Sequence, residues 1–425
     1  MTRIAVPAQR TPGATEALAE SEALAVPGTA RTRPPRDIAV VDLRSDTVTR
    51  PDAEMRAAMA SAEVGDDILD GDPTMRALED RAAELLGVEA ALWLPSGSMA
   101  NHVALTIQLR PGDRFLAPRL AHVLEYELGA AAWLAGGMPA ALPWSAGPGR
   151  ITATSLRRTP SPGPMAYDAL RDRLLCLENT HNAAGGTVTP PGEHRAVVAA
   201  AKAAGLSVHL DGARIWNAAV AARTSPAELT RGVDSVQACL SKGLGAPMGS
   251  VLGGSAGFVR EARRVRKMLG GAVRQGGVVA AAGLIALNRV QDLEADHVKA
   301  RLLARGLRDQ GWNVNVPETN VVLAEVADAD RTVAELRGAG VLAAALAGCV
   351  RMVTHRDVTE KDVRGVVARA GRLAAAGWDT RTGEWRSEGT AAETGALRVG
   401  WRTRRVPRPA GSPADASEPP LRRAR

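Results

Sequence analysis

The chain has 425 residues, of which 45% are hydrophobic and 23% are charged, with a formal net charge of +7. This length is greater than one compact domain needs, and the composition excludes a mainly disordered or fibrous protein. The apolar stretch 338–350 ends at Arg351 and is too short to span a bilayer, so we expect no transmembrane helix.

The positive charge is concentrated near the C-terminal end. Residues 398–425 contain eight arginines against Asp415 and Glu418, a local charge of +6, so the rest of the chain is nearly neutral. We interpret these arginines as part of a solvated tail. A nucleic-acid binder is the alternative, but no RNA- or DNA-binding fold is indicated, and we expect neither nucleic acid nor membrane as a partner.

The cysteines and the N-terminal segment bear on location. Cys176, Cys239 and Cys349 are widely separated and none lies in a CxxC motif, which argues against a disulfide framework and against a metal site. Arg3 is not followed by a long apolar core, so the start does not resemble a secretory signal. These features predict a cytoplasmic protein.

Composition shifts divide the chain into four parts. We expect a disordered leader over 1–37, a large domain over 38–289, a smaller α/β domain over 290–377 and a disordered Pro/Arg-rich tail over 378–425.

The predicted elements, in chain order, alternate short apolar strands with helical patterns. The large domain has strands at 90–94, 114–117, 174–177, 206–210 and 236–240, with helices from about 98 and over 193–204. The smaller domain has a helix over 291–310, strands at 313–316, 321–324 and 350–354, and a last helix to about 376. This order predicts an α/β fold with a mainly parallel central sheet covered by helices.

Polar residues follow several of these strands directly. They are Ser96, Glu178, Asp211 and Lys242. Because parallel sheets bind ligands at the carboxyl ends of their strands, these residues predict a shared site.

Lys242 stands in Ser241-Lys242-Gly243-Leu244-Gly245, where glycines bring the backbone close. A lysine amine held in such a turn can form a Schiff base with a carbonyl cofactor, although a surface lysine in a turn fits the pattern equally well. Asp211 ends a strand and needs a cationic partner, either a protonated cofactor ring or, in an ordinary ion pair, Arg214.

A strand, a small-residue turn and a helix start meet at Gly97 and Ser98, and such helix starts bind anions such as phosphate. His122 opens another helix and could stack on a flat cofactor or act as a base. Arg351 follows an apolar run and suits a carboxylate, and Arg274 lies in a glycine-rich loop. Each of these residues alone is also compatible with a structural role.

The motifs together resemble the low-specificity threonine aldolase and β-eliminating lyase family. The resemblance covers roughly residues 40–375. It rests on Asp42-Leu43-Arg44-Ser45-Asp46-Thr47-Val48-Thr49, Gly65-Asp66-Asp67, Asp72-Pro73-Thr74, Glu178-Asn179-Thr180-His181-Asn182, His209-Leu210-Asp211-Gly212-Ala213-Arg214 and Ser241-Lys242-Gly243-Leu244-Gly245.

The resemblance implies the aspartate-aminotransferase type of fold, fold type I of the pyridoxal-phosphate-dependent transferases, with that cofactor bound. Lys242 would hold the cofactor covalently, Asp211 would pair with its ring nitrogen and Arg214 with its ring oxygen. Gly97 and Ser98 would hold its phosphate.

The resemblance also implies substrate contacts and an assembly. His122 would stack on the ring near the substrate hydroxyl, and Ser45 and Arg351 would hold the substrate carboxylate. Arg274 would reach a cofactor phosphate in a neighbouring subunit of a homodimer or homotetramer.

The implied reaction cleaves a β-hydroxy-α-amino acid, of the threonine or allo-threonine type, into glycine and an aldehyde. β-Elimination and racemisation on the same scaffold are alternatives, and a non-catalytic cofactor-binding protein is a third. Family members commonly carry a tyrosine where Leu69 stands and some carry a histidine near Asp168. Both departures predict modest threonine cleavage and better rates with a larger substrate such as phenylserine.

Overall fold

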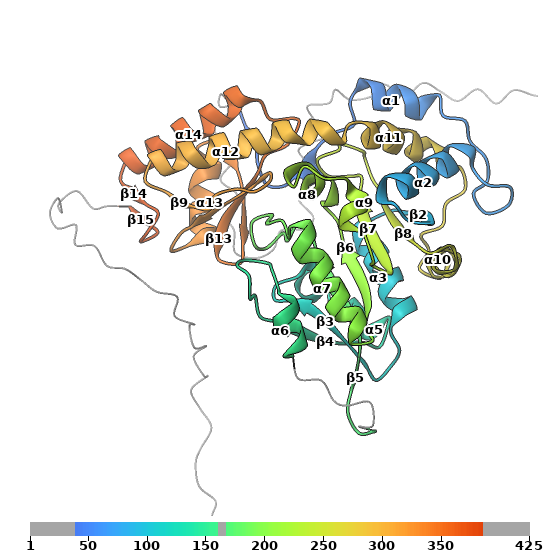
Figure 1. Cartoon of the computed structure of the whole chain (residues 1–425). Coiled ribbons are helices and arrows are strands. Elements are labelled where there is room, and N and C mark those ends of the chain that lie inside the picture. The colour runs from blue at the N-terminus through green and yellow to red at the C-terminus, as the bar shows by residue number, and fades with distance from the viewer. Residues whose placement is uncertain (1–38, 160–166, 386–425) are drawn as a thin grey trace, which may run out of the picture. The chain divides into compact units, whose positions relative to one another are not determined.

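The structure is a computed structural model that describes residues 39–159 and 167–385 (Figure 1). The predicted leader lies outside the described residues, and so does the predicted tail beyond residue 385. Residues 378–385, which we expected to belong to that tail, instead form a hairpin of β14 (Trp378–Asp379) and β15 (Glu384–Trp385). The Trp378 side chain of this hairpin is buried, so these residues pack against the C-terminal part of the fold.

A seven-stranded sheet carries the predicted polar strand ends, in the order β2-β8-β7-β6-β5-β3-β4. Only β8 runs antiparallel to its neighbours, so the predicted mainly parallel sheet is confirmed. The strands are β2 (Ala90–Leu94), β3 (Asp113–Pro118), β4 (Met138–Leu142), β5 (Arg171–Glu178), β6 (Ser207–Asp211), β7 (Ser235–Cys239) and β8 (Ser250–Gly254). The sequence analysis did not predict β4 or β8.

Helices cover this sheet, and local side chains fix where they begin. The Asp72 carboxylate caps the first turn of α2 and Ser96 caps α3, each by accepting a backbone N–H three residues on. Gly87 ends α2 in the left-handed conformation, at φ 63°. The helices of this part are α1 (Ala53–Ala60), α2 (Pro73–Leu86), α3 (Gly97–Gln108), α4 (His122–Glu125), α5 (Ala130–Trp133), α6 (Ala153–Arg157), α7 (Pro191–Ala203), α8 (Ile215–Ala221), α9 (Pro226–Leu229), α10 (Ala256–Met268) and α11 (Gly277–Asn288), with the 3-10 turn η1 (Asp46–Val48).

A second sheet, in the order β12-β13-β10-β9, lies in the C-terminal part and has its own hydrophobic core. A short parallel pair joins β1 to β11, so the N-terminal segment packs with this part. The elements are β1 (Val41–Asp42), η2 (Val290–Asp292), α12 (Leu293–Asp309), β9 (Asn313–Val314), β10 (Val321–Glu325), α13 (Ala329–Gly338), β11 (Val341–Leu342), β12 (Ala344–Leu346), β13 (Cys349–Val353) and α14 (Glu360–Ala375). The position of a domain boundary near residue 290 stays a prediction.

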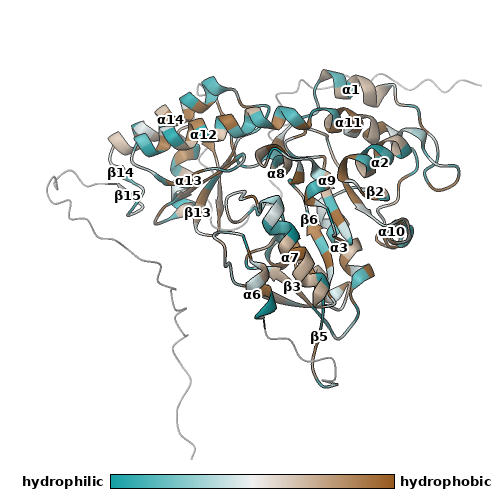
Figure 2. Cartoon of the chain, in the orientation of Figure 1, coloured by the Kyte–Doolittle hydropathy of each residue, from teal (hydrophilic) through white to brown (hydrophobic). Residues whose placement is uncertain are grey.

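The hydropathy of the helices matches their packing. In Figure 2, α12 and α14 carry both hydrophilic and hydrophobic residues along their length. Buried side chains recur along α12 every three or four residues, at Ala300, Leu303, Ala304 and Leu307, which is the spacing of one helix face. None of the helices within residues 39–159 and 167–385 has the length and apolarity that a membrane span requires.

Candidate active site

A pocket of about 310 Å³ lies at the carboxyl ends of β5, β6 and β7. Its lining includes every predicted site residue except Arg274: Ser45, Gly97, Ser98, His122, Asp211, Arg214, Lys242 and Arg351. The predicted convergence of polar strand ends is therefore present in the structure. A larger groove of about 980 Å³, which includes the starts of β3 and β5, contains none of these residues.

Asp211 is the last residue of β6 and is buried at the base of this pocket. Its Oδ2 accepts a hydrogen bond from Asn101 Nδ2 at 2.8 Å, and its Oδ1 accepts from Gln237 Nε2 and from the backbone N–H of Ala213. It forms no ion pair with Arg214 among the described residues, so the alternative of an ordinary Asp211–Arg214 pair is wrong. Neutral amides hold this carboxylate in place without satisfying its charge.

Arg214 is paired with Asp46 instead. Its Nη2 and Nε lie 2.6 and 2.8 Å from the two carboxylate oxygens, and Nη1 donates to Asn182 Oδ1 at 3.2 Å. Burial raises the pKa of Asp46, but Arg214, and next Lys242 and Arg351, outweigh it and hold this pKa well below its usual 3.8. Two of the five guanidinium N–H groups stay available for a further acceptor in the pocket.

Lys242 lies in the turn after β7. Thr49 fixes this turn by donating its hydroxyl to the Lys242 carbonyl oxygen at 2.7 Å. Among the described residues, the Lys242 ammonium has no hydrogen-bond partner. Lys242 lines the pocket, and within the described residues no acceptor competes with a ligand for its amine.

The predicted anion-binding turn is the start of α3, whose first residues Gly97 and Ser98 line the pocket. Gly97 packs closely against the sheet, because a Cβ at this position would lie 2.7 Å from the Cys239 Sγ. Only glycine lets the helix start this close to β7. The backbone N–H groups and the dipole of this twelve-residue helix favour an anion at its start.

Arg351 and Ser45 line another part of the pocket. The Arg351 side chain is buried, and its Nε has no partner among the described residues. Burial, together with the neighbouring Arg214, lowers the pKa of Arg351 to about 10. A buried guanidinium with an unsatisfied donor favours a carboxylate ligand.

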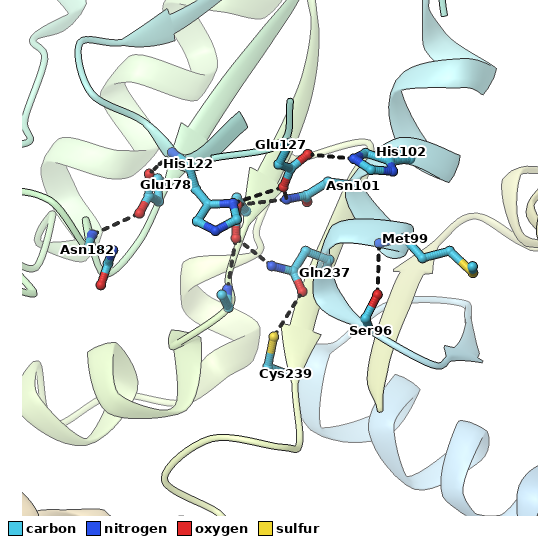
Figure 3. A network of polar contacts seen from close by, with 12 residues as sticks. Ser96, Met99, Asn101, His102, His122, Glu127, Glu178, Asn182, Gln237 and Cys239 are labelled. Atoms are coloured by element: carbon cyan, nitrogen blue, oxygen red, sulfur yellow. Dashed lines mark hydrogen bonds and ion pairs between the residues drawn. The ribbon is translucent and has the colours of Figure 1, made fainter. Parts of the chain in front are cut away.

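His122 is held from both its backbone and its ring. Its backbone N–H donates to Glu178 Oε2 at 2.8 Å, and its Nδ1 lies 2.9 Å from Glu127 Oε1 (Figure 3). Burial lowers the pKa of His122, but the Glu127 hydrogen bond and the charges of Asp211 and Glu178 outweigh it and raise this pKa above 6.5. These acidic neighbours therefore favour the protonated imidazole.

A buried polar network behind the pocket was missed by the sequence analysis. Asn101 Nδ2 donates both to Glu127 Oε1, at 2.7 Å, and to Asp211 Oδ2, while its Oδ1 lies 3.0 Å from His209 Nε2. Burial lowers the pKa of His209 to about 4, so this imidazole is neutral. Polar residues inside apolar strands, such as His209 in β6 and Gln237 in β7, were the signal that could have revealed this network.

Three of these groups could in principle surround a cation. One ligand atom each of His122, Glu127 and Asp211 lies within 4.8 Å of the others. However, the Asn101 amide donates to both carboxylates, and its partly positive hydrogens stabilise their negative charges, as a cation would. The arrangement is explained by hydrogen bonding without a metal.

Three residues with predicted roles do not line this pocket. Arg274 is 54% exposed at its side chain and pairs with Asp66 at 3.0 Å. Leu69 is 75% exposed and Asp168 is also exposed. Within one chain, therefore, neither sequence departure shapes the pocket, and the expectation of modest threonine cleavage gains no support from the structure.

The pocket fits pyridoxal phosphate on three observations. A lysine amine without a partner, a buried carboxylate held by neutral amides, and a helix start that only glycine allows all border one cavity of about 310 Å³. Together with the sheet, this defines a fold type I pyridoxal-phosphate-dependent enzyme, as the family resemblance implies.

Comparison with known proteins identifies the family. The family model described as β-eliminating lyase matches residues 42–329, and the chain belongs to this family. It is 41% identical over 335 residues to low-specificity L-threonine aldolase 1 of Arabidopsis thaliana, covering 76% of this chain and 93% of that protein. It is 40% identical over 331 residues to low specificity L-threonine aldolase of Escherichia coli K12, covering 77% and 98%. The predicted class, a pyridoxal-phosphate-dependent lyase, is confirmed.

Solved structures support the fold. The threonine aldolase of Leishmania major has a TM-score of 0.65 at 20% identity, covering 78% of this chain and 99% of that one. The serine palmitoyltransferase of Sphingomonas wittichii has a TM-score of 0.64 at 21% identity, covering 79% and 88%. A serine palmitoyltransferase solved with pyridoxal phosphate has the same fold, at a TM-score of 0.61 and 17% identity.

Proposed function

We propose that this chain is an aldolase that cleaves the Cα–Cβ bond of a β-hydroxy-α-amino acid, of the threonine type, to give glycine and an aldehyde. The observation that carries the proposal is the placement of His122, Lys242 and Arg351 around one pocket. A base, an amine and a carboxylate-binding cation are the three groups that this reaction requires. The similarity to low-specificity threonine aldolases supports the substrate class.

The residues that hold the cofactor follow from the same pocket. Lys242 would provide the amine for its carbonyl carbon, and Asp211 would provide a negative charge for its ring nitrogen. Arg214 would use its remaining N–H groups for the ring oxygen, while Gly97 and Ser98 would receive the phosphate at the start of α3. When bound, pyridoxal phosphate supplies an electron sink for the electron pair that the broken bond leaves behind.

Substrate binding sets which bond is broken. Arg351 binds the substrate carboxylate through a charge-assisted hydrogen bond, and the Ser45 hydroxyl contributes a second contact. With the carboxylate fixed at one end of the pocket, the β-hydroxyl is oriented toward His122. His122 Nε2 then accepts the hydroxyl proton as the Cα–Cβ bond breaks. The orientation of the bound substrate, and not the strength of its binding, selects which bond breaks.

The experiment that tests the function begins with an absorbance spectrum of the purified protein, which shows whether the cofactor is bound covalently. Glycine and aldehyde release is then measured with threonine, allo-threonine and phenylserine. We expect Lys242→Ala to abolish turnover and to remove the absorbance band of the lysine-bound cofactor. Wild-type turnover in Lys242→Ala would contradict the role of this lysine. Release of ammonia and a keto acid, without glycine, would show that the enzyme catalyses β-elimination and not aldol cleavage.

We also infer a homo-oligomer, a dimer or tetramer, in a reducing compartment such as the cytoplasm. Support for shared sites comes from Arg274, which is exposed in a glycine-rich loop and away from the pocket of its own chain. Support for the compartment comes from Cys176, Cys239 and Cys349, which are free thiols. Light scattering and sedimentation of the purified protein measure the assembly directly.

A further inference from the structure

We propose that Glu127 and His102 are positioning residues for His122. The buried Glu127 carboxylate fixes the His122 imidazole with its proton on Nδ1 and its Nε2 free for the substrate hydroxyl, and His102 holds the second Glu127 oxygen. The inference rests on the proposed function, because it concerns the base that this function assigns to His122.

The geometry of Glu127 separates its two oxygens. Oε1 faces His122 Nδ1 at 2.9 Å and Asn101 Nδ2 at 2.7 Å, whereas Oε2 faces His102 Nε2 at 3.2 Å (Figure 3). The Glu127 side chain is 1% exposed, so water does not compete for either oxygen. Oε1 takes part in two hydrogen bonds, whereas the Oε2–His102 contact is an ion-pair distance without an aligned hydrogen bond. A buried carboxylate contacted in this way has little freedom to rotate, and the imidazole bound to Oε1 is fixed as well.

The charge state of Glu127 decides the tautomer of His122. Burial raises the pKa of Glu127, but the interactions with the neighbouring His102, His122 and Asn101 side chains outweigh it and hold this pKa at about 2. An ionised carboxylate accepts hydrogen bonds and donates none. The neutral His122 ring must therefore carry its proton on Nδ1, and Nε2 keeps the lone pair that accepts a proton.

Several charges act on His122 besides Glu127. Glu178 approaches from the end of β5 and Asp211 from the end of β6, and the ring of Tyr126, the residue after α4, has its centroid 5.6 Å from that of His122. Glu127 is the one that contacts the ring nitrogen. Removing its charge must shift the titration of His122, while Glu178 and Asp211 remain in place.

His102 extends the contact away from the pocket. It lies on α3, its side chain is 21% exposed, and it is not among the residues that line the cavity. No role in binding the substrate or cofactor accounts for it. Its contact with Oε2 leaves Oε1 as the oxygen that faces His122.

The test uses holoenzyme labelled with ¹⁵N-histidine. The chain has only seven histidines, so few NMR signals must be resolved. NMR reads the tautomer and the titration of His122, assigned from the signal lost in His122→Asn, and pH profiles of kcat and KM are measured in parallel. The variants are Glu127→Gln, His102→Leu, which removes the polar ring nitrogen near Oε2, and His102→Gln, which keeps a polar side chain there. Glu125→Gln is the control, because it removes the same charge from an exposed position two residues away.

We expect Glu127→Gln to lower the His122 pKa, to mix its tautomers and to move the acid limb of the pH profile to lower pH. We expect kcat to fall by about 10–100-fold with little change in KM, since a general base contributes about 100-fold or more. His102→Leu should shift both readouts in the same direction by less, His102→Gln should restore them, and Glu125→Gln should leave them unchanged.

An unchanged His122 tautomer, titration and pH profile in Glu127→Gln would overturn the proposal. Should that variant not fold, unchanged readouts in His102→Leu would overturn the part assigned to His102, and a shift restored by His102→Gln would support the chain of contacts. Absence of aldol cleavage in the wild-type enzyme would instead reject the proposed function, and the NMR titration would still decide whether Glu127 controls His122.

Discussion

Replacing Asp46 by asparagine tests how much the buried Asp46–Arg214 ion pair contributes to the stability of the folded protein. Asp46 is fully buried, and it pairs with Arg214, which is also buried, through contacts of 2.6 and 2.8 Å. Asn320 donates a third hydrogen bond to it at 3.2 Å. In Asp46→Asn the shape is kept but the negative charge is lost, and the buried Arg214 guanidinium loses its carboxylate partner.

The expected cost is large, because breaking a buried ion pair by removing one partner costs about 3–5 kcal/mol. The matched control is Asp42→Asn, four residues earlier, whose pair with Arg44 is partly exposed, with side chains 27% and 47% accessible. Such a pair contributes about 0–1 kcal/mol. Urea unfolding of both holoenzyme variants, with unchanged slopes, should show a midpoint shift several times larger for Asp46→Asn.

The pH dependence gives a second readout. The pKa of Asp46 is held below its ordinary 3.8 in the folded protein, so its stabilising contribution is fully present above the unfolded pKa. That contribution is lost only as the pH falls through the lower folded value. The stability difference between wild type and Asp46→Asn should therefore stay constant from about pH 5 to about pH 8 and shrink in acid. Equal midpoint shifts for Asp46→Asn and Asp42→Asn would refute this reasoning.

Two further predictions concern the cofactor site. Gly97→Ala places a Cβ 2.7 Å from Cys239 Sγ, so at an overpacking cost of about 1–3 kcal/mol it should weaken pyridoxal phosphate binding. Titration of the apoenzyme with the cofactor measures this loss of affinity. Adding Cys239→Ala to the Gly97→Ala variant should restore binding. The control Gly192→Ala, with open space around it, should have no effect. For shared sites, mixing Lys242→Ala with Arg274→Ala subunits should recover part of the activity lost in each, and verified hetero-oligomers without recovery would exclude sharing.

The sequence predicted those parts of the site that chain order alone determines. Asp211 and Lys242 follow apolar strands directly, and parallel strands bring their carboxyl ends together. The small-residue turn at Gly97 was recognisable for the same reason, since it links β2 to α3. Strand ends were correct to within a few residues because the buried runs are continuous.

The partners of these residues could not be predicted, because they depend on contacts across long stretches of chain. Asp46 is 168 positions from Arg214, and Asn101 is 110 positions from Asp211. Glu127 was missed because two acidic residues around a tyrosine resemble an exposed turn. Its burial follows from the packing of α3 against the segment after α4, which the periodicity of neither segment reveals.

Asp46 and Glu127, whose contacts the sequence analysis did not predict, stabilise different parts of the pocket. Asp46 is bound by Arg214 and Asn320 and lies near Lys242 and Arg351, so it balances the cations that would receive the cofactor oxygen and the substrate carboxylate. Glu127 is bound by His122, His102 and Asn101, so it serves the proposed base. Among the described residues, these two sets of hydrogen-bond and ion-pair partners have no member in common. The proposed substrate-binding and proton-transfer roles therefore depend on different buried carboxylates, while Asn101 links Glu127 to Asp211. A substitution of Asp46 should leave the contacts of Glu127 in place, because the two carboxylates share no partner in the part of the chain that the structure describes.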